Sequence, residues 1–588
     1  MPRKAQGGEK VGIVRETQEN GDIYVYERVT IYDSNLHYSK VKSRTLIGKI
    51  LKGTDEMIDT RPKKKSAAQL AAAQNAGESL PSSSRRHVGM LDIVAHVAEK
   101  CGIRNEVFKA LGDDKGAAQK ILTMAWYAFA TDGGTWPGIK SWCIKYNGQL
   151  PYRDGAISQD MYHDLFVKLG KNEQLKQSVF QHRAQNMGAG ELLALDSTTI
   201  ATESKNLNSG RMSIHKDKLI KNVYKVVEIY SITSRQPVAY ARIPGNIPDG
   251  MTVENAMKQL ESLGLKQPEI VADSGYCSED NMLYMIRKGF RFIMHVSSDT
   301  KWISPLLSQY REELLYGGEI LHCDPKFSGV TVQIEHIFEY ERQRASKKSG
   351  LERGDTEQIT KMLYVHIYFS SLKKAEEDIK FRTRYDLIRN SLLRGALVEK
   401  DDLAFAEKYM LIHRWGDRVL DVQPNSEAFR KQSRYHGFVV LVASREKDTN
   451  TAFEKYRARE YVEEDFKNCK YHIGGNHPRV WNDDTLDGQI LVQFLAQSMH
   501  ESFATMLRTQ RDILGVPNGD AEHDTNDNLR QEIQLKNWIN KTSMNGILQW
   551  FDAIERITAD TTVKKTWRTE TTKRDRMFLD KLGIKPRG

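Results

Sequence analysis

The chain has 588 residues and a mass of 67.3 kDa, which is too long for one hydrophobic core, so we expect several domains. Its formal net charge of +10 and pI near 9.0 favour a polyanionic partner such as nucleic acid. Five scattered cysteines with no CxxC pair argue against a disulfide framework and a structural zinc site. No apolar run approaches the ~18–20 residues of a membrane span, and the start lacks an apolar signal region, so we expect no membrane partner and a cytoplasmic protein.

The beginning of the chain predicts a small β-rich domain followed by a linker. Residues 11–53 alternate apolar and polar side chains, as in GDIYVYERVTIYD, with a turn at Asn20-Gly21. Residues 1–62 are therefore assigned to a β-rich N-terminal domain. Residues 63–88 are poor in bulky apolar side chains and rich in Ala, Ser and Lys, which is typical of a flexible linker.

Residues 89–190 change to a helical period, as in MLDIVAHVAEKCGI and AAQKILTMAWYAFA. A compact helical domain of this size on a basic protein is a candidate DNA-binding domain. Packing alone explains any one of these helices equally well, and the pattern indicates no recognition helix.

From residue 191 the pattern predicts a mixed α/β sheet covered by helices. Three strand-like segments are followed by alternating helices and strands up to residue 300. Residues 301–432 interrupt this alternation and are predicted to form a β-rich insertion domain. Residues 433–510 return to the sheet with the strand GFVVLVAS, and residues 511–588 predict a helical C-terminal region.

Two aspartates follow apolar strand-like runs. Asp196 follows LLAL, and Asp273 follows EIVA. Central strands normally stay apolar, so a carboxylate at a strand end must be desolvated, paired or bound to a metal ion. Each aspartate taken singly is most often a turn or cap residue.

The segment YRAREYVEEDFKNCK, residues 456–470, predicts one helix with four polar side chains along one line. Tyr456, Arg459, Glu463 and Lys470 fall within roughly 60° of one another on a helical wheel. The apolar side chains form a separate stripe beside this line: Ala458, Val462, Phe466 and Cys469. Taken alone, the helix favours a solvated face with an Arg459–Glu463 ion pair over a functional site.

Together, Asp196, Asp273 and Glu463 supply three oxygen ligands on one predicted sheet. Hard cations such as Mg²⁺ or Mn²⁺ take ligands of this kind. Two such ions about 3.5–4 Å apart can activate the attacking oxygen and stabilise the leaving oxygen of a phosphoryl transfer. The combination therefore predicts metal-dependent phosphoryl transfer.

These residues resemble those of the DDE transposases of bacterial insertion sequences, in the superfamily named after insertion sequence four. The Y-x2-R-x3-E-x6-K signature of that group matches at Tyr456, Arg459, Glu463 and Lys470. Its D-x-G-Y-x-S-x-x-N pattern matches VADSGYCSEDN, which contains Asp273. LLALDSTTI resembles the strand of the first aspartate, and the long interval before the glutamate resembles the insertion of these enzymes.

The resemblance implies an RNase H-like core, in two parts at 191–300 and 433–510, and cut-and-paste transposition through a DNA hairpin. It implies that Asp196, Asp273 and Glu463 are catalytic and bind two divalent metal ions, Mg²⁺ or Mn²⁺. The implied partners are double-stranded DNA, as terminal inverted repeats and as target, and a second copy of the chain in a synaptic homodimer. The implied location is the nucleoid of a prokaryotic cytoplasm, and the C-terminal region is a candidate dimer interface.

The resemblance also implies DNA-binding residues. Tyr456, Arg459 and Lys470 would hold backbone phosphates near the scissile bond. Relatives with this signature flip a base onto an aromatic side chain, for which Phe438 is the first candidate and Trp302 the second. Core packing is the alternative role for both aromatic residues.

Two functions of other classes stay open from the sequence. One is a DNA-binding regulator that keeps the fold without catalysis, and the other is a metal-dependent nuclease of the same fold. The complete set of three acids and four signature residues favours an active transposase over the first, and the phosphate-holding residues favour it over the second.

Overall fold

The computed structural model describes residues 9–33, 38–60, 83–214, 219–265, 267–341, 354–416, 418–475, 478–520, 523, 525–559 and 565–586. The chain divides into two compact units, Met1–Ser83 with Ala559–Lys565, and Ser84–Thr558 with Thr566–Gly588. Residues 63–82 of the predicted linker lie outside the described residues.

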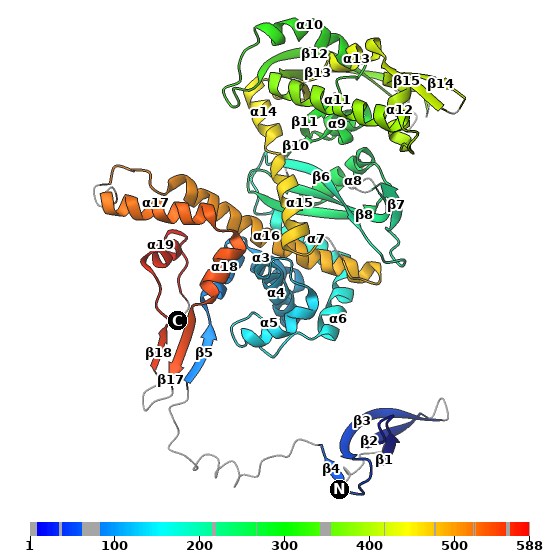
Figure 1. Cartoon of the computed structure of the whole chain (residues 1–588). Helices are drawn as coiled ribbons and strands as arrows, with labels where there is room; N and C mark the ends of the chain where they lie inside the picture. Colours follow the sequence, from blue (N-terminus) through cyan, green and yellow to red (C-terminus); the bar gives the residue numbers. More distant parts are fainter. Residues whose placement is uncertain are drawn as a thin grey trace. The chain divides into compact units, whose positions relative to one another are not determined.

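The first unit contains a small antiparallel sheet, as the alternating sequence predicts (Figure 1). Its strands are adjacent in chain order: β1 (Glu9–Thr17), β2 (Ile23–Asp33), β3 (Tyr38–Ile50) and β4 (Met57–Asp59). Gly21 has φ +86° in the turn between β1 and β2, a conformation that glycine adopts without strain. Val25, Ile47 and Ile50 form the buried core of this sheet.

The second unit begins with a helical region and includes one long helix from much later in the chain. The helices of the region are α2 (Gly89–Lys100), α3 (Ile103–Leu111), α4 (Lys115–Ala130), α5 (Ile139–Lys145), α6 (Gln159–Gly170) and α7 (Glu173–Ala184). The long helix α16 (Asp483–Ile513) packs against α4 and α6. A Cβ atom at Gly170 would lie 1.8 Å from the Asp484 carbonyl oxygen, and one at Gly488 would lie 2.0 Å from that of Phe166. Helices α6 and α16 therefore cross in backbone contact.

A mixed nine-stranded sheet forms the centre of the second unit, as predicted for an α/β fold. Its order is β12-β13-β16-β11-β10-β6-β8-β7, with β9 also paired to β8, and β10 runs parallel to β6 and β11. The strands are β6 (Leu192–Ala201), β7 (Arg211–Ile214), β8 (Ile220–Ser231), β9 (Gln236–Pro244), β10 (Glu269–Ala272), β11 (Arg291–Val296), β12 (Ser328–Glu341), β13 (Thr356–Phe369) and β16 (Phe438–Ala443). The helices between these strands are α8 (Val253–Ser262), α9 (Glu279–Lys288) and α10 (Ile303–Tyr316).

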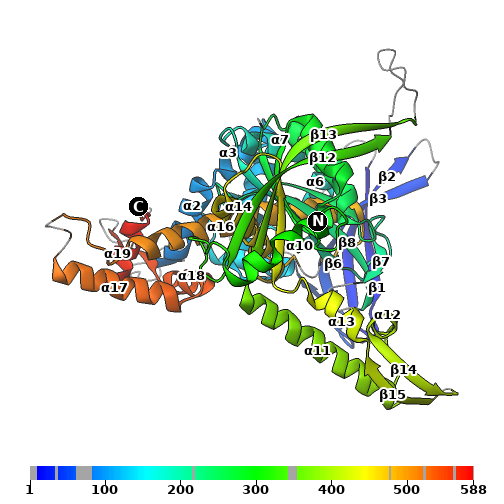
Figure 2. The same cartoon turned by 90° about the horizontal axis from the view of Figure 1, so that it is seen from above.

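The prediction of a β-rich insertion domain at 301–432 was wrong. Strands β12 and β13 belong to the central sheet, because β13 pairs with β16 through Tyr364–Phe369. The rest has its own hydrophobic core, which includes Tyr385, Phe405 and Val422. We call this part the insertion subdomain; it comprises α11 (Ser371–Leu393), α12 (Lys400–Tyr409), β14 (Met410–Trp415), β15 (Arg418–Pro424) and α13 (Ser426–Ser433) (Figure 2).

The C-terminal region is not purely helical, contrary to the prediction. Helices α17 (Asn526–Lys541), α18 (Met544–Asp552) and α19 (Lys573–Lys581) are accompanied by the strands β17 (Glu555–Ala559) and β18 (Lys565–Arg568). These strands form a three-stranded sheet with β5 (Ser83–His87), which the sequence assigned to the linker. Of the helices that the structure describes, none has the length and apolar character to cross a membrane.

Arg183 on α7 joins the helical region to the central sheet and to α16. Its guanidinium donates to the Glu106 carboxylate at 2.6 and 3.1 Å, to the Ser498 hydroxyl at 2.8 Å and to the Pro237 carbonyl at 2.6 Å. Arg183 and Glu106 are both buried. A buried ion pair depends on both partners, because either charge alone is left without compensation.

We expect Arg183→Ala to lower the free energy of unfolding by about 3–5 kcal/mol, because Glu106 would stay buried without its counter-charge. Urea denaturation followed by circular dichroism measures this change. The control is Arg104→Ala on α3, an exposed arginine whose replacement should change the free energy by less than about 0.5 kcal/mol. Equal unfolding midpoints for the two variants would contradict the assigned role of Arg183.

Candidate active site

Asp196 and Asp273 lie side by side where two parallel strands separate. The ladder between β6 and β10 runs through the pair Leu195–Ala272, and the two aspartates are the next residues. Strand β10 ends at Ala272, so Asp273 follows a strand end as predicted. The prediction that Asp196 ends its strand was wrong, because the other edge of β6 stays paired with β8 as far as Ala201.

The alternation of side chains along the strands directs the candidate residues to one face of the sheet. Ala194, Val271 and Ile293 belong to the core cluster that also contains Val462 of the signature segment, residues 456–470. Asp196, Asp273 and His295 each lie two residues further along, so they share this face. The acids therefore lie under the helices that follow β16.

The segment predicted as one helix consists of two helices. Helix α14 (Thr449–Arg457) carries Tyr456, and α15 (Glu460–His472) carries Glu463 and Lys470. Between the two helices the backbone hydrogen bonds join residues three apart instead of four apart. The Arg459 N–H donates to the Tyr456 carbonyl at 3.0 Å, and the Val462 N–H donates to the Arg459 carbonyl at 3.0 Å. The predicted apolar stripe is buried at Val462 and Phe466, as expected, and the remaining members are partly buried.

The guanidinium of Arg459 lies among the three candidate acids. Its Nη1 donates to Asp196 Oδ2 at 3.2 Å, and its Nη2 donates to Glu463 Oε1 at 2.7 Å. The same Nη2 lies 3.9 Å from Asp273 Oδ2. One buried cation thus brings together carboxylates from a strand, a strand end and a helix, which are far apart in the sequence.

The two aspartates have opposite electrostatic environments. Burial raises the pKa of Asp196 to about 6, a shift that the charge of Arg459 only partly offsets and that Glu463 and Asp273 reinforce. The pKa of Asp273 is held well below its usual range, chiefly by His295 and also by the backbone N–H of Ser274 and by Arg459. Asp273 is therefore the more strongly ionised of the two.

Tyr456 and His295 complete the surroundings of Asp273. The Tyr456 hydroxyl donates to Asp273 Oδ1 at 3.4 Å, and His295 Nδ1 lies 3.5 Å from the same oxygen. The two rings are 6.0 Å apart. Sequence reasoning missed His295, although its position near the end of the predicted strand FRFIMHV, two residues from an apolar core position, is the signal that identifies it.

The other residues of the second-aspartate motif hold the turn after Asp273. Ser278 caps α9 by accepting from the Asn281 N–H at 3.1 Å. The Asn281 side chain donates to the carbonyls of Gly250 at 2.8 Å and Tyr276 at 2.9 Å. The Tyr276 side chain is buried beneath the turn. The Tyr276 N–H donates to the Asp273 carbonyl at 3.0 Å, so these motif residues hold the backbone of the aspartate.

Lys470 lies in the last turn of α15, beside the strand of the first aspartate. Its Nζ donates to the Thr199 carbonyl at 3.0 Å, three residues along β6 from Asp196. The structure therefore brings all four signature residues to one side of the sheet.

The two proposed base platforms are not exposed aromatic surfaces. Phe438 is 5% exposed, and its ring lies 4.9 Å from that of Phe369 in the sheet core. Trp302 precedes α10 and lies 4.4 Å from the ring of His336. Phe438 lies in the interior and Trp302 is partly buried against the core, so both side chains have the core-packing role that the sequence analysis gave as the alternative.

The inner face of α15 is held by a buried acidic pair. Gln497 of α16 donates to Glu228 Oε1 at 3.3 Å and also contacts Asp465 of α15. Burial raises the pKa of Glu228 to about 7, and burial together with Glu228 raises the pKa of Asp465. Burial thus favours the protonated form at this pair, and the Gln497 amide ties both carboxyl groups, and with them α15, to α16.

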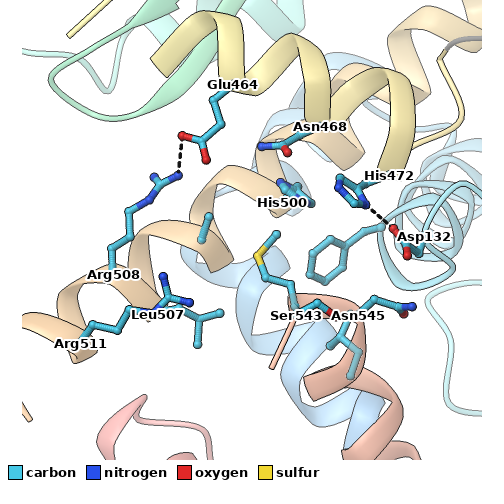
Figure 3. A pocket seen from close by; sticks show the side chains of 14 residues that line it. Asp132, Glu464, Asn468, His472, His500, Leu507, Arg508, Arg511, Ser543 and Asn545 are labelled. Carbon is cyan, nitrogen blue, oxygen red and sulfur yellow. Dashed lines mark hydrogen bonds and ion pairs between the residues drawn. The ribbon is translucent and has the colours of Figure 1, made fainter. Parts of the chain in front are cut away.

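A separate cavity of about 220 Å³ lies between α15 and α16 (Figure 3). From α15 it is lined by Glu464, Asn468 and His472. Arg508 of α16 donates to Glu464 at 3.3 Å across it. None of the three candidate acids lines this cavity, so Glu464 marks a face of α15 that is distinct from the face of Glu463.

Across the described part of the chain, no three Asp, Glu, His or Cys side chains converge closely enough to hold one metal ion. The candidate acids instead surround Arg459. Their chemistry nevertheless fits a hard divalent cation, since all three offer carboxylate oxygens and already share one positive group.

Comparisons with known proteins identify the class. Residues 188–499, a little over half of the chain, match the family described as Transposase DDE domain. The chain belongs to this family and is a DDE transposase, an enzyme of DNA recombination. A comparison with curated proteins gives no match. Among solved structures, the chain is similar to a cryo-EM structure of the piggyBac transposase synaptic complex with hairpin DNA, with 9% identity and a TM-score of 0.34 over 78% of this chain and 81% of that chain.

We expect Arg459→Gln to make thermal stability depend on divalent metal. Without the guanidinium, three neighbouring carboxylates lose their shared counter-charge, so the Tm without metal should fall and added Mn²⁺ should raise it more than in the wild type. Differential scanning fluorimetry with and without Mn²⁺ measures both effects. Arg457→Gln is the control, since Arg457 pairs with Asp324 and Glu460 outside the site. Equal Mn²⁺ shifts in both variants would refute a metal site at these acids.

Proposed function

We propose that the chain is a cut-and-paste transposase of the insertion-sequence-four superfamily, in the branch with the Y-R-E-K signature, and that its central sheet is an RNase H-like core. Three antiparallel strands, β9, β8 and β6, continue into the parallel strands β10 and β11, which supports that fold. The observation that carries the proposal is the meeting of Asp196, Asp273 and Glu463 around Arg459.

In this proposal Asp196, Asp273 and Glu463 are the catalytic residues and hold two divalent metal ions, Mg²⁺ or Mn²⁺. Such ions, when bound, activate the attacking oxygen and stabilise the leaving oxygen of an in-line displacement. His295 orients Asp273, while the backbone N–H of Ser197 at 2.8 Å orients Asp196. Both aspartates are thereby oriented before substrate arrives.

Tyr456, Arg459 and Lys470 then bind the DNA backbone beside the scissile bond. Arg459 exchanges its carboxylate partners for a phosphate, which is the other anion that a guanidinium fork matches in geometry. Tyr456 contributes a hydroxyl donor, and Lys470 contributes a charge at the far end of α15. The three side chains orient the strand so that its phosphorus faces the acids.

The proposed reaction is a series of displacements at phosphorus. Water attacks the phosphodiester at the element end and releases a 3′-OH. That 3′-OH attacks the opposite strand and forms a hairpin, which a second water opens. The regenerated 3′-OH then attacks target DNA. In each step one phosphorus–oxygen bond forms as another breaks, so one set of side chains serves all four.

The proposal extends to the partners and to the other regions. The DNA partners are the terminal inverted repeats and the target, and two copies of the chain pair the two ends as a homodimer. We assign end recognition to residues 89–190 and dimer contacts to residues 511–588. The core would act on the nucleoid of a prokaryotic cell. The net charge of +10 supports a DNA partner.

A strand-transfer assay tests the function. The full chain is incubated with Mg²⁺ or Mn²⁺, duplexes that carry the element ends and a plasmid target. Joined products support the transposase. Cleavage without joining would indicate a nuclease, and binding without cleavage would indicate a DNA-binding regulator.

We expect Asp196→Ala and Glu463→Ala to abolish cleavage, because each removes a carboxylate from the acidic cluster. Binding of the element end should stay within a few-fold of wild type, measured by gel shift beside the cleavage assay. Glu464→Ala is the matched control, since this adjacent acid pairs with Arg508 on the other face of α15 and should leave cleavage near the wild-type rate. Cleavage by the Glu463→Ala variant at wild-type rate would refute the assignment.

We expect Lys470→Ala to weaken end binding and to reduce its salt dependence by about one phosphate contact, a change of ~0.9 in the slope of log K against log salt. Fluorescence anisotropy at several NaCl concentrations measures the slope. Lys467→Ala, an exposed lysine on the same helix, is the control and should keep the wild-type slope. An unchanged slope for Lys470→Ala would count against the phosphate contact.

A further inference from the structure

The antiparallel sheet of the first unit has two faces of different chemistry. Side chains alternate between the faces along each strand, and cross-strand partners share a face. One face carries Val25, which belongs to the buried core of this sheet. The other we call the tyrosine face; its residues are Lys10, Gly12, Val14 and Glu16 of β1, Tyr24, Tyr26, Arg28, Thr30 and Tyr32 of β2, and Val41, Arg44, Leu46 and Lys49 of β3.

Positive charge is concentrated on the tyrosine face. Its cations are Lys10, Arg28, Arg44 and Lys49, and its acid is Glu16. Arg44 pairs with Glu16, and its guanidinium lies 3.8 Å from the centre of the Tyr26 ring. Lys10 and Arg28 are exposed and form no ion pair within the part of the chain that the structure describes. A surface with free cations beside exposed aromatic rings attracts a polyanion.

The middle of the tyrosine face is open on one side of Arg28. Arg28 on the central strand lies between Gly12 of β1 and Arg44 of β3. A Cβ atom at Gly12 would have no other atom within 4 Å, so neither packing nor space requires a glycine there. Glycine weakens a strand, and within strands it often marks a place where a ligand approaches closely. The Gly12 position therefore leaves room for a partner to reach the Arg28 guanidinium.

The width of the sheet at this position suits the major groove of DNA. Strand β4 pairs only with Gly48–Ile50, so the sheet is three strands wide at Arg28. Neighbouring strands lie ~4.8 Å apart, which places the outer strands about 10 Å from each other. The major groove of B-DNA is about 12 Å wide, and several proteins place β-strands in it. With β2 over the base edges, β1 and β3 lie towards the two phosphate backbones.

We propose that the tyrosine face binds duplex DNA in the major groove, where Arg28 donates to the O6 and N7 atoms of a guanine and Lys10 holds a backbone phosphate. A guanidinium matches these two guanine acceptors in geometry. The inference goes beyond the end recognition assigned to residues 89–190, and it rests on the proposed function for its DNA partner. Because the face belongs to a separate compact unit of the same chain, its contact adds to the affinity of the whole chain for one DNA molecule.

The test uses the full chain, a duplex that carries the element end and an unrelated duplex of the same length, with affinity measured by fluorescence anisotropy. Arg28→Ala should weaken binding to the element end about 5- to 150-fold, as loss of one bidentate base contact predicts, and should change binding to the unrelated duplex much less. Lys10→Gln should weaken binding to both duplexes and lower the salt slope by ~0.9. Arg15→Gln, which changes an exposed arginine on the opposite face, is the matched control and should behave as wild type.

Gly12→Val separates a groove contact from a structural role. Valine suits a strand, and the Cβ atom at this position meets no neighbour, so the Tm and the circular dichroism spectrum should stay at their wild-type values. The added side chain would stand between the DNA and Arg28. Binding to the element end should therefore fall at least as far as in Arg28→Ala, and Gly12→Ala should weaken it less.

The outcomes separate this contact from the proposed function. If wild-type protein cleaves the element end but Arg28→Ala and Gly12→Val bind it as Arg15→Gln does, the groove contact is wrong while the proposed function stands. If these variants lose binding but the wild type neither cleaves nor joins DNA, the contact stands and the transposase activity fails. If the variants change the sedimentation of the free protein and not DNA binding, the tyrosine face is a protein interface and the inference is refuted. A wild type that binds neither duplex would overturn both.

Discussion

The site depends on one guanidinium that lies among three carboxylates and supplies their shared positive charge. Asp196, Asp273 and Glu463 come from separate parts of the chain, and their negative charges would repel one another at this range. Arg459 offsets part of that repulsion with contacts at 3.2, 3.9 and 2.7 Å. Two features of the backbone make this possible: the parallel ladder that ends beside both aspartates, and the tight turn between α14 and α15 that directs Arg459 inward. A cation in the same place would compete with the arginine, so occupancy of the site by metal and release of Arg459 are linked.

Much of this site could be predicted from the sequence, because its residues lie in short segments whose spacing and apolar runs can be recognised without knowing the fold. The spacing of Tyr456, Arg459, Glu463 and Lys470 identifies one helical surface, and apolar runs before Asp196 and Asp273 identify strands. The break between α14 and α15 could not be predicted, since no glycine or proline lies between residues 449 and 472. It is imposed by packing, as is the continuation of β6 past Asp196, which depends on β8. Tertiary contacts of this kind leave no local signal.

Aromatic residues show the same limit more clearly. A phenylalanine that opens an apolar strand and a tryptophan that follows one both resemble stacking platforms, yet Phe438 is buried and Trp302 packs partly buried against the core. Trp415, by contrast, lies in a polar stretch that carries no motif, and its side chain is 80% exposed. The exposure of an aromatic side chain depends on which strands pair around it. The pairing of β13 with β16 assigns one part of the predicted insertion to the central sheet and leaves the other part as the insertion subdomain. The alternation that predicts a strand does not say to which sheet it belongs.

The crossing of α6 and α16 has a consequence for the evolution of the chain. At Gly170 and Gly488 the main chains of the two helices are in contact. The space between them is too small for the methyl group of an alanine. Any other amino acid there would force the helices apart, and α16 carries Gln497, which anchors the helix of Glu463. Sequence drift is therefore far more restricted at these two glycines than their distance from the chemistry implies. A substitution at either glycine is therefore expected to disturb the helix that carries Glu463 through the packing of α16, without touching the acids.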